Sequence, residues 1–283
     1  MKRKIKQIID SQDVMMGDHR IGQPLPVAQL EQISPFILLH HGAPKIYEPG
    51  MAAIEVAPHP HRGFEPVTFV FQGEVEHHDS RGNENVVKNG GVQWLTAGMG
   101  IIHAGGASKS FQETGGEFEM IQLWINLPKK LKMVQPNYQA LERDDIPFYV
   151  DNNTRVNVIS GEIKGLKGPI NSLTDVLALT LEMKDNGKIV IDIPENRNIL
   201  LYQLHGKTAI NGQEIGDKKL IEFEKEGTEI QIKADKDTVI LFLAGYPINE
   251  PMVQHGPFVM NNQTEILEAM RDYRLGKMGF LPA

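Results

Sequence analysis

The chain has 283 residues, a formal net charge of −7 and no cysteine. This length is enough to bury one large core or two modest ones without covalent cross-links. The acidic balance excludes the basic footprint of direct nucleic-acid binding, and the cysteine count excludes disulfide scaffolds, thiol nucleophiles and cysteine-ligated zinc. Any metal must therefore be held by histidine and carboxylate side chains.

The first residues, MKRKIKQIIDSQDVMM, are basic at the start but contain no apolar run of the length found in a signal sequence. No later stretch approaches the ~18 apolar residues of a membrane span. We therefore expect a cytoplasmic protein without membrane association.

Short apolar runs separated by turn residues fill the sequence, which contains 17 prolines and 27 glycines. This pattern predicts an all-β fold. The predicted strands are 36–41, 66–72, 91–97, 118–127, 176–183, 188–193, 199–206 and 238–245. Near the end, TEILEAMRDYRLG spaces its apolar residues at helical intervals and predicts a short C-terminal helix, with Asn262 as N-cap and Gly276 as its stop. A second, shorter helix is expected around LPKKLKM.

The two halves of the chain echo each other, since in each half a strand runs into a turn and a hairpin follows. Such a duplication predicts two β-barrels or sandwiches. We expect an N-terminal barrel over residues 1–145 that carries the candidate site, and a C-terminal barrel over residues 146–283 that ends in the helix. Aligning Gly206 on Gly73 leaves no histidine in the second barrel at the candidate positions, so that barrel is expected to hold no metal.

Three histidines form the candidate site. His59 and His61 are two residues apart, so both rings project from the same face of an extended segment and could chelate one ion. On this pair alone, a metal site and two ordinary histidines are about equally favoured. His103 follows a turn containing Gly98 and Gly100, just inside a strand, and shifts the balance toward a metal site.

Other side chains near these histidines have ordinary explanations as well as functional ones. His77 and His78 are adjacent, so one at most faces inward, and His77 is a candidate for the pocket wall or for a hydrogen bond to a ligand. Glu65 follows the histidine pair by four residues and is a weaker candidate. Trp94 and Trp124 are best explained by core packing, and Trp94 is also a candidate for the pocket wall.

Motifs of other enzyme classes do not occur in the sequence. GxSxG, the Walker A pattern and GxGxxG followed by a helix are all absent from it, so hydrolase, nucleotidase and dinucleotide-binding functions have no support.

Five stretches, in chain order, resemble the motifs of the pirin family. The members of this family are bicupin proteins of the cupin superfamily. The five stretches are HPHRGFE (59–65), VEHHDSRGN (75–83), QWLTAGMGIIHA (93–104), QLWINLP (122–128) and QHGPFVMN (254–261). The resemblance implies two cupin-type barrels, with one iron-type metal bound in the N-terminal barrel. It places the metal ligands on His59, His61 and His103.

The sequence departs from the family pattern at one ligand position. The usual fourth ligand is a glutamate two residues after the third histidine, and here that residue is Gly105. Three neutral imidazoles can still bind a divalent ion and leave positions for water or substrate, with one more unit of positive charge at the metal. A Gly105→Glu substitution is expected to restore the carboxylate on the same strand face as His103 and to tighten metal binding.

The family resemblance also implies a function. It indicates a mononuclear non-haem dioxygenase of the quercetin 2,3-dioxygenase type, acting on a small aromatic, flavonol-like substrate and O2. Fe(II) is the expected ion, and Zn, Ni, Mn and Cu stay open; the sequence identifies no catalytic residue beyond the ligands. Two alternatives also stay open: a metal-dependent regulatory protein that acts through a protein partner, and a pirin-like barrel whose metal binding is weakened by Gly105.

Overall fold

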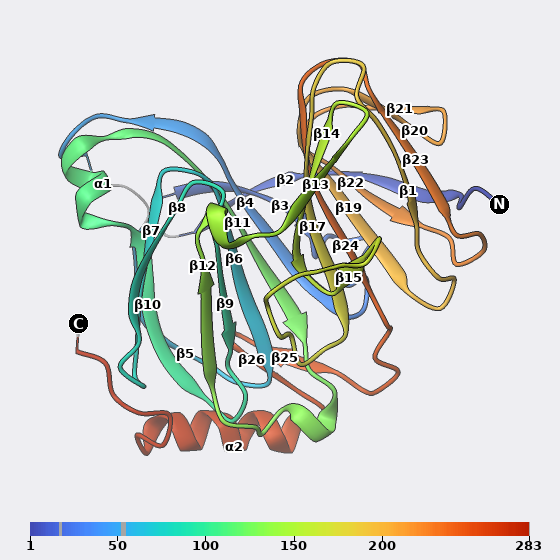
Figure 1. Ribbon diagram of the computed structural model, residues 1–283. Coiled ribbons are helices and arrows are strands. Elements are labelled where there is room, and N and C mark those ends of the chain that lie inside the picture. The colour runs from blue at the N-terminus through green and yellow to red at the C-terminus, as the bar shows by residue number, and fades with distance from the viewer. Residues whose placement is uncertain (17–18, 52–54, 283) are drawn as a thin grey trace. The chain divides into compact units, whose positions relative to one another are not determined.

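The computed structural model describes residues 1–16, 19–51 and 55–282 (Figure 1). Strands dominate this described part, which contains two α-helices, α1 (Lys109–Thr114) and α2 (Gln263–Arg274). The prediction of an all-β chain with a short C-terminal helix is confirmed. Among the described residues, no helix is both long enough and apolar enough to cross a membrane.

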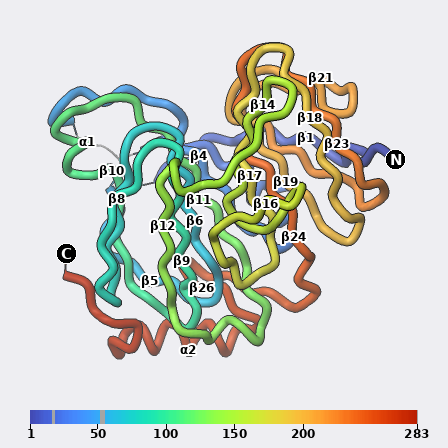
Figure 2. The backbone as a smooth tube through the Cα atoms, in the orientation of Figure 1, coloured from blue at the N-terminus to red at the C-terminus, as the bar shows by residue number. Residues whose placement is uncertain are grey.

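The chain forms two compact units, and each is built from separate parts of the sequence. The first unit comprises Met1–Val14, Gly22–Ile37 and Asp145–Pro247, and the second comprises Met15–Ile21, Leu38–Asp144 and Ile248–Ala283. The expected boundary between the two barrels after residue 145 stays a prediction. In the middle of the chain, the second unit ends at Asp144 and the first unit continues from Asp145. The structure adds an exchange of the end segments, because Met1–Val14 belongs to the first unit, whereas α2 belongs to the second unit together with Leu38–Asp144 (Figure 2).

Two sheets build the second unit. The seven-stranded sheet has the order β12-β9-β6-β11-β4-β3-β2, and the four-stranded sheet has the order β5-β10-β7-β8. Residues of both sheets line one cavity, so the sheets face each other across it. The strands are β2 (Gln12–Met16), β3 (His19–Leu25), β4 (Phe36–Tyr47), β5 (Glu55–His61), β6 (Phe64–Gln72), β7 (Glu74–Asp79), β8 (Glu84–Lys88), β9 (Val92–Thr96), β10 (Ile101–Ala107), β11 (Gly116–Asn126) and β12 (Asn137–Leu141).

The first unit repeats this plan. Its seven-stranded sheet has the order β1-β22-β19-β24-β17-β14-β13, its four-stranded sheet has the order β18-β23-β20-β21, and β15 pairs with β16. The strands are β1 (Ile5–Asp10), β13 (Phe148–Asp151), β14 (Thr154–Ser160), β15 (Glu162–Ile163), β16 (Leu166–Lys167), β17 (Val176–Met183), β18 (Lys188–Asp192), β19 (Asn198–His205), β20 (Thr208–Ile210), β21 (Gln213–Ile215), β22 (Lys219–Phe223), β23 (Glu229–Ala234) and β24 (Thr238–Gly245).

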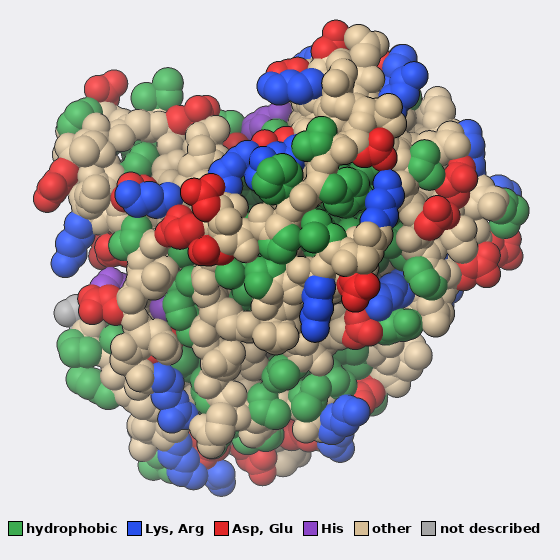
Figure 3. Space-filling view, viewed as in Figure 1, with side chains coloured by type: hydrophobic (Ala, Val, Ile, Leu, Met, Phe, Trp, Pro, Cys, Tyr) green, Lys and Arg blue, Asp and Glu red, His purple; other side chains and the backbone are tan. Residues whose placement is uncertain are grey.

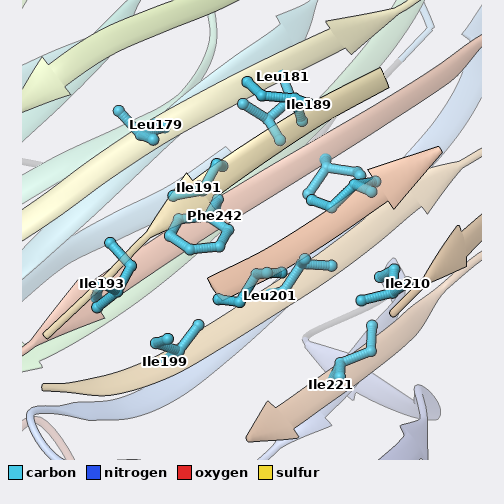
Figure 4. Packing of buried hydrophobic residues seen from close by; sticks show 14 of the residues in the cluster. Leu179, Leu181, Ile189, Ile191, Ile193, Ile199, Leu201, Ile210, Ile221 and Phe242 are labelled. Atoms are coloured by element: carbon cyan, nitrogen blue, oxygen red, sulfur yellow. The ribbon is translucent and has the colours of Figure 1, made fainter. Parts of the chain in front are cut away.

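Aliphatic side chains fill the interior of the first unit. Along β18 the buried residues Ile189 and Ile191 alternate with exposed ones, which is the pattern of a strand with one buried face. They pack with Leu179, Leu201 and Phe242 from the facing sheet (Figure 4). Burial of each such side chain contributes about 1.5–3 kcal/mol. This interior is therefore a packed core.

The C-terminal segment completes the second unit with a short strand pair, β25 (Val253–His255) and β26 (Phe258–Met260), followed by α2. As predicted, Asn262 caps α2, and its side chain accepts a hydrogen bond from the backbone N–H of Glu265. Ile266 of α2 and Met260 of β26 pack with Ile102 of β10 in one buried apolar cluster. The segment thus supports the outer side of a strand that carries one of the candidate histidines.

The short helix and the charges on the surface complete the description of the fold. The helix expected around LPKKLKM is a single 3-10 turn, Lys129–Leu131. Acidic and basic side chains are interspersed on the face seen in Figure 3. This is consistent with a sequence that contains no long block of one charge.

Candidate metal centre

The three predicted histidines meet in the second unit. His59 and His61 lie on β5, where strand alternation turns both rings to one face, and His103 on β10 pairs directly with His59. The Nε2 atom of His59 lies 3.0 Å from Nε2 of His61 and 3.0 Å from Nε2 of His103. Among the described residues, these three form the group of side chains whose ligand atoms are close enough to hold one metal ion, all within 4.8 Å of one another.

The surroundings of the histidines favour neutral imidazoles. His61 is buried, and His59 and His103 are partly buried. Burial lowers the pKa of His59, and burial together with the neighbouring histidines lowers the pKa of His61 and of His103 well below the usual value. Neutral imidazole is the form that offers a lone pair to a metal.

Backbone carbonyls fix the orientation of two of the rings. The Nδ1 atom of His59 lies 2.8 Å from the carbonyl oxygen of Ala57, and Nδ1 of His61 lies 3.4 Å from that of Pro257. An Nδ1–H that donates to a carbonyl leaves the Nε2 lone pair pointing at the shared centre. The Nδ1 atom of His103 is buried and has no hydrogen-bond partner within the described ranges.

This arrangement fits a divalent cation. Three lone pairs at such short range repel one another unless a positive charge lies between them. The two separations of 3.0 Å, from His59 to His61 and from His59 to His103, are compatible with nitrogens about 2.1 Å from a common ion. The three histidines therefore fit a divalent ion that binds imidazole nitrogen.

The carboxyl groups of Glu65 and Glu119 do not line the cavity, whereas Glu76 is among the residues that line it. Glu65 is fully buried and accepts a hydrogen bond from the hydroxyl of Thr96 at 2.8 Å, away from the cavity lining. Glu119 lies 2.8 Å from Nε2 of His41. Gly105 lines the cavity together with Ala104 and Gly106, and it supplies no side chain. Glu65 is not among the residues that line the cavity, because on β6 its side chain lies on the face opposite to that of Thr68.

His77 is held firmly beside the histidine cluster and lines the same cavity. Its ring stacks on Tyr138 with centroids 4.1 Å apart, and its centroid is 5.4 Å from that of His103. Its Nε2 atom lies 3.0 Å from a carboxylate oxygen of Asp79. Burial favours the neutral form of that carboxyl group, but hydrogen bonds from His77, Asn83 and backbone N–H groups outweigh it and lower the pKa of Asp79.

The cavity has a volume of about 310 Å³, at the lower end of the range for small-molecule sites. Its walls are mainly apolar and include Ile21, Leu38 and Trp124. The ring of Trp124 meets that of His61 edge to face at a centroid distance of 5.4 Å. Trp124 is thus part of the cavity wall, which differs from the expectation that it serves core packing alone.

Trp94 is fully buried and is not among the residues that line the cavity, in keeping with core packing. Neighbouring strand residues face opposite ways, and on β9 it is Gln93 that faces the cavity. Thr68 and Gln122 also line the cavity and were missed by the sequence analysis. The signal that could have found them is a polar residue at an inward position of an otherwise apolar strand.

Comparison with known protein families identifies relatives of the whole chain. A family profile described as Pirin matches residues 17–125, and one described as Pirin C-terminal cupin domain matches residues 178–279. A pirin-like protein of Solanum lycopersicum is 36% identical over 264 residues, which are 92% of this chain and 86% of that protein.

Solved structures show the same likeness. The crystal structure of quercetin 2,3-dioxygenase from Acinetobacter baumannii is 36% identical in sequence to this chain, with a TM-score of 0.92 and 99% of each chain covered. A bacterial pirin from Escherichia coli, crystallised in complex with nickel(II), is 21% identical, with a TM-score of 0.67 and coverage of 86% of this chain and 99% of that one. At that identity the second likeness concerns the fold alone.

Proposed function

Because this chain belongs to the pirin family, we propose that it is a metal-dependent dioxygenase of the quercetin 2,3-dioxygenase type, acting on a flavonol-like molecule. The observation that carries the proposal is the convergence of three Nε2 atoms at the wall of a mainly apolar cavity. The likeness over the whole chain to a structure described as quercetin 2,3-dioxygenase supports the same reaction.

We assign the metal to His59, His61 and His103, and Fe(II) is the ion that we propose. Three neutral imidazoles suit Fe(II), and they also suit Ni(II), Mn(II) and Zn(II). When bound, such an ion supplies Lewis acidity toward an enol oxygen of the substrate. Because Gly105 supplies no carboxylate, one more coordination position stays open for a deprotonated substrate hydroxyl. The metal centre also keeps one more unit of positive charge, which favours that hydroxyl.

The residues of the chain itself bind and orient the substrate. Trp124 and Leu38 offer apolar surface to a planar aromatic ligand and keep water away from the histidines. The hydrogen bonds of His59 to Ala57 and of His61 to Pro257 hold the imidazoles in one tautomer and one direction. No backbone movement is then needed to present three nitrogens to one ion.

The test combines metal analysis with oxygen uptake. Protein purified without an affinity tag should retain about one equivalent of metal and, when loaded with Fe(II), consume O2 in the presence of quercetin. His59→Ala, His61→Ala and His103→Ala should each lower metal affinity by more than about a hundredfold, because loss of an outer hydrogen-bond partner alone costs about 10–100-fold.

His78→Ala is the matched control, because His78 is partly exposed and pairs with Glu84. This variant should keep both metal and activity. Flat oxygen traces across several flavonols for fully metallated protein would contradict the enzyme and favour a metal-dependent binding protein.

A further inference from the structure

Three polar side chains form a row across the sheet that faces the histidines. Gln122 on β11 pairs with Thr68 on β6, and Thr68 pairs with Gln93 on β9. All three line the cavity. Because side chains at paired positions of neighbouring strands stand side by side, the three form one continuous band, which we call the polar row.

The polar row has hydrogen-bonding capacity that the described residues leave unused. The amide Nε2 of Gln93 donates to the carbonyl oxygen of Val75 at 3.0 Å, which orients its Oε1 as a further acceptor. The side chains of Gln122 and Thr68 have no hydrogen-bond partner in residues 1–16, 19–51 or 55–282. Polar groups in such partly enclosed, apolar surroundings are normally paired with water or with a ligand.

The residues around the polar row set it apart from the rest of the wall. On β11 the neighbouring residues on the same face, Met120 and Trp124, also line the cavity and are apolar. The histidine cluster comes from the opposite sheet, on β5 and β10. A ligand between the two sheets therefore meets metal-binding nitrogens on one side and amide and hydroxyl groups on the other.

The cavity also restricts the charge of the groups that the polar row can recognise. No lysine or arginine is found among the described residues that line it. A carboxylate or phosphate on this side would lose its hydration without gaining a cationic partner. Hydroxyl and carbonyl groups of a ligand suit the amide and hydroxyl groups of the polar row, because they form hydrogen bonds without carrying a charge.

We propose that Gln122, Thr68 and Gln93 determine substrate specificity by hydrogen bonding to uncharged ring hydroxyls on the substrate side that faces the seven-stranded sheet. This inference rests on the proposed function, because it assumes an aromatic ligand held at the histidine cluster. It assigns the preference for a polyhydroxylated ring over an unsubstituted one to the polar row and not to the metal.

The experiment measures ligand dissociation constants for Ni(II)-loaded protein without O2, so that binding is read separately from turnover. The probes are quercetin, which has two hydroxyls on its pendant ring, and galangin, the flavonol whose pendant ring has none. Wild-type protein should bind quercetin about tenfold more tightly. Gln122→Leu and Thr68→Val should each reduce this preference by about two- to tenfold, the range expected for one neutral hydrogen bond, and leave galangin binding unchanged.

Gln72→Leu is the matched control, because it makes the same change on β6 at a residue that bonds to Asn89 and does not line the cavity. The preference in this variant should equal that of the wild type. Two separate variants, each checked for nickel content and melting temperature, protect the result against misfolding of either one.

The outcomes separate this inference from the proposed function. An unchanged preference in both row variants, or no binding of either flavonol by the wild type, overturns the inference. A preference that falls in the row variants supports it even if Fe(II)-loaded protein consumes no O2, which would contradict only the dioxygenase. Oxygen uptake together with an unchanged preference would retain the enzyme and overturn the role of the polar row.

Discussion

Gly105 and Glu76 lie so close across the neighbouring strands β10 and β7 that a Cβ atom on Gly105 would be 2.5 Å from the carbonyl oxygen of Glu76. The obstacle is backbone, which cannot rotate away as a flexible side chain can. Gly105 is also the position where the family pattern has a metal-binding glutamate. Adding a side chain there requires a shift of β10 relative to β7, although Gly105 faces the cavity.

We therefore expect Gly105→Glu not to tighten metal binding, which revises the expectation from the sequence. Gly105→Ala and Gly105→Glu should each lower the free energy of unfolding by about 1–3 kcal/mol, the usual cost of overpacking. Urea unfolding and metal titration measure the two effects. Gly216→Ala is the control, because a Cβ atom there meets nothing within 4 Å. Tighter metal binding by a stable Gly105→Glu variant would show that β10 can move.

Arg62 should act as a positioning residue for the histidine pair. It follows His61 directly, donates from Nε to the carbonyl oxygen of Met99 at 2.6 Å, and donates from both terminal nitrogens to Asp272 of α2 at 3.1 Å. Loss of a hydrogen bond to a charged group costs about 1.5–3 kcal/mol. Arg62→Ala should show a loss of this size in urea unfolding, with metal affinity lowered about tenfold.

Arg271→Ala tests whether this effect is specific. Arg271 also contacts the Asp272 carboxylate, but its side chain is 62% exposed. An exposed pair of this kind contributes about 0–1 kcal/mol, so both stability and metal affinity should stay close to those of the wild type. Equal losses in the two variants would argue against a special role for Arg62.

The charge of Asp272 should make part of the free energy of unfolding depend on pH. A hydrogen bond from Lys277, followed by the contacts with Arg62, lowers the pKa of Asp272 to about 2. Because this value is below that of an unfolded chain, the contribution is present above about pH 4 and is lost as the pH falls toward 2. After allowance for solvent screening it should be about 1 kcal/mol.

The measurement compares wild type with Asp272→Asn by urea unfolding at several pH values. The stability difference between the two proteins should be constant from pH 7 to 5 and should narrow between pH 4 and 3. A difference that stays the same down to pH 3 would mean that the carboxylate of Asp272 is not stabilised in its charged form.

The pH dependence of turnover should reveal the missing glutamate. Gly105 supplies no carboxylate to accept the proton of a substrate hydroxyl, so kcat/KM should rise with pH as the flavonol itself ionises. For two flavonols of different acidity, the rise should occur at two different pH values. Superimposed profiles would instead indicate a proton acceptor within the protein.

Local patterns in the sequence predicted the strands well. The predicted segments 176–183 and 238–245 coincide with β17 (Val176–Met183) and β24 (Thr238–Gly245). Such strands are recognisable because apolar residues and flanking turn residues are properties of neighbouring positions. The exchange of the end segments between the units was not predictable in this way, because it depends on contacts between residues far apart in sequence.

The candidate site was predictable only in part, for the same reason. The shared face of His59 and His61 follows from strand alternation, whereas the placement of His103 opposite His59 depends on the register of β5 and β10. The polar row also depends on register, since it appears only when β11, β6 and β9 are paired. The close approach of Glu76 to Gly105 depends on backbone geometry, which residue identities do not specify.

The divided second unit has a consequence for folding during synthesis. The strands that carry the histidines leave the ribosome long before Ile248–Ala283, the segment that provides Pro257 and α2. Until that segment arrives, Ile102 lacks its apolar partners and the ring of His61 lacks its carbonyl contact. A nascent chain paused before residue 248 would thus expose apolar side chains of β10, and it would already contain all three histidines without the contact that orients the ring of His61.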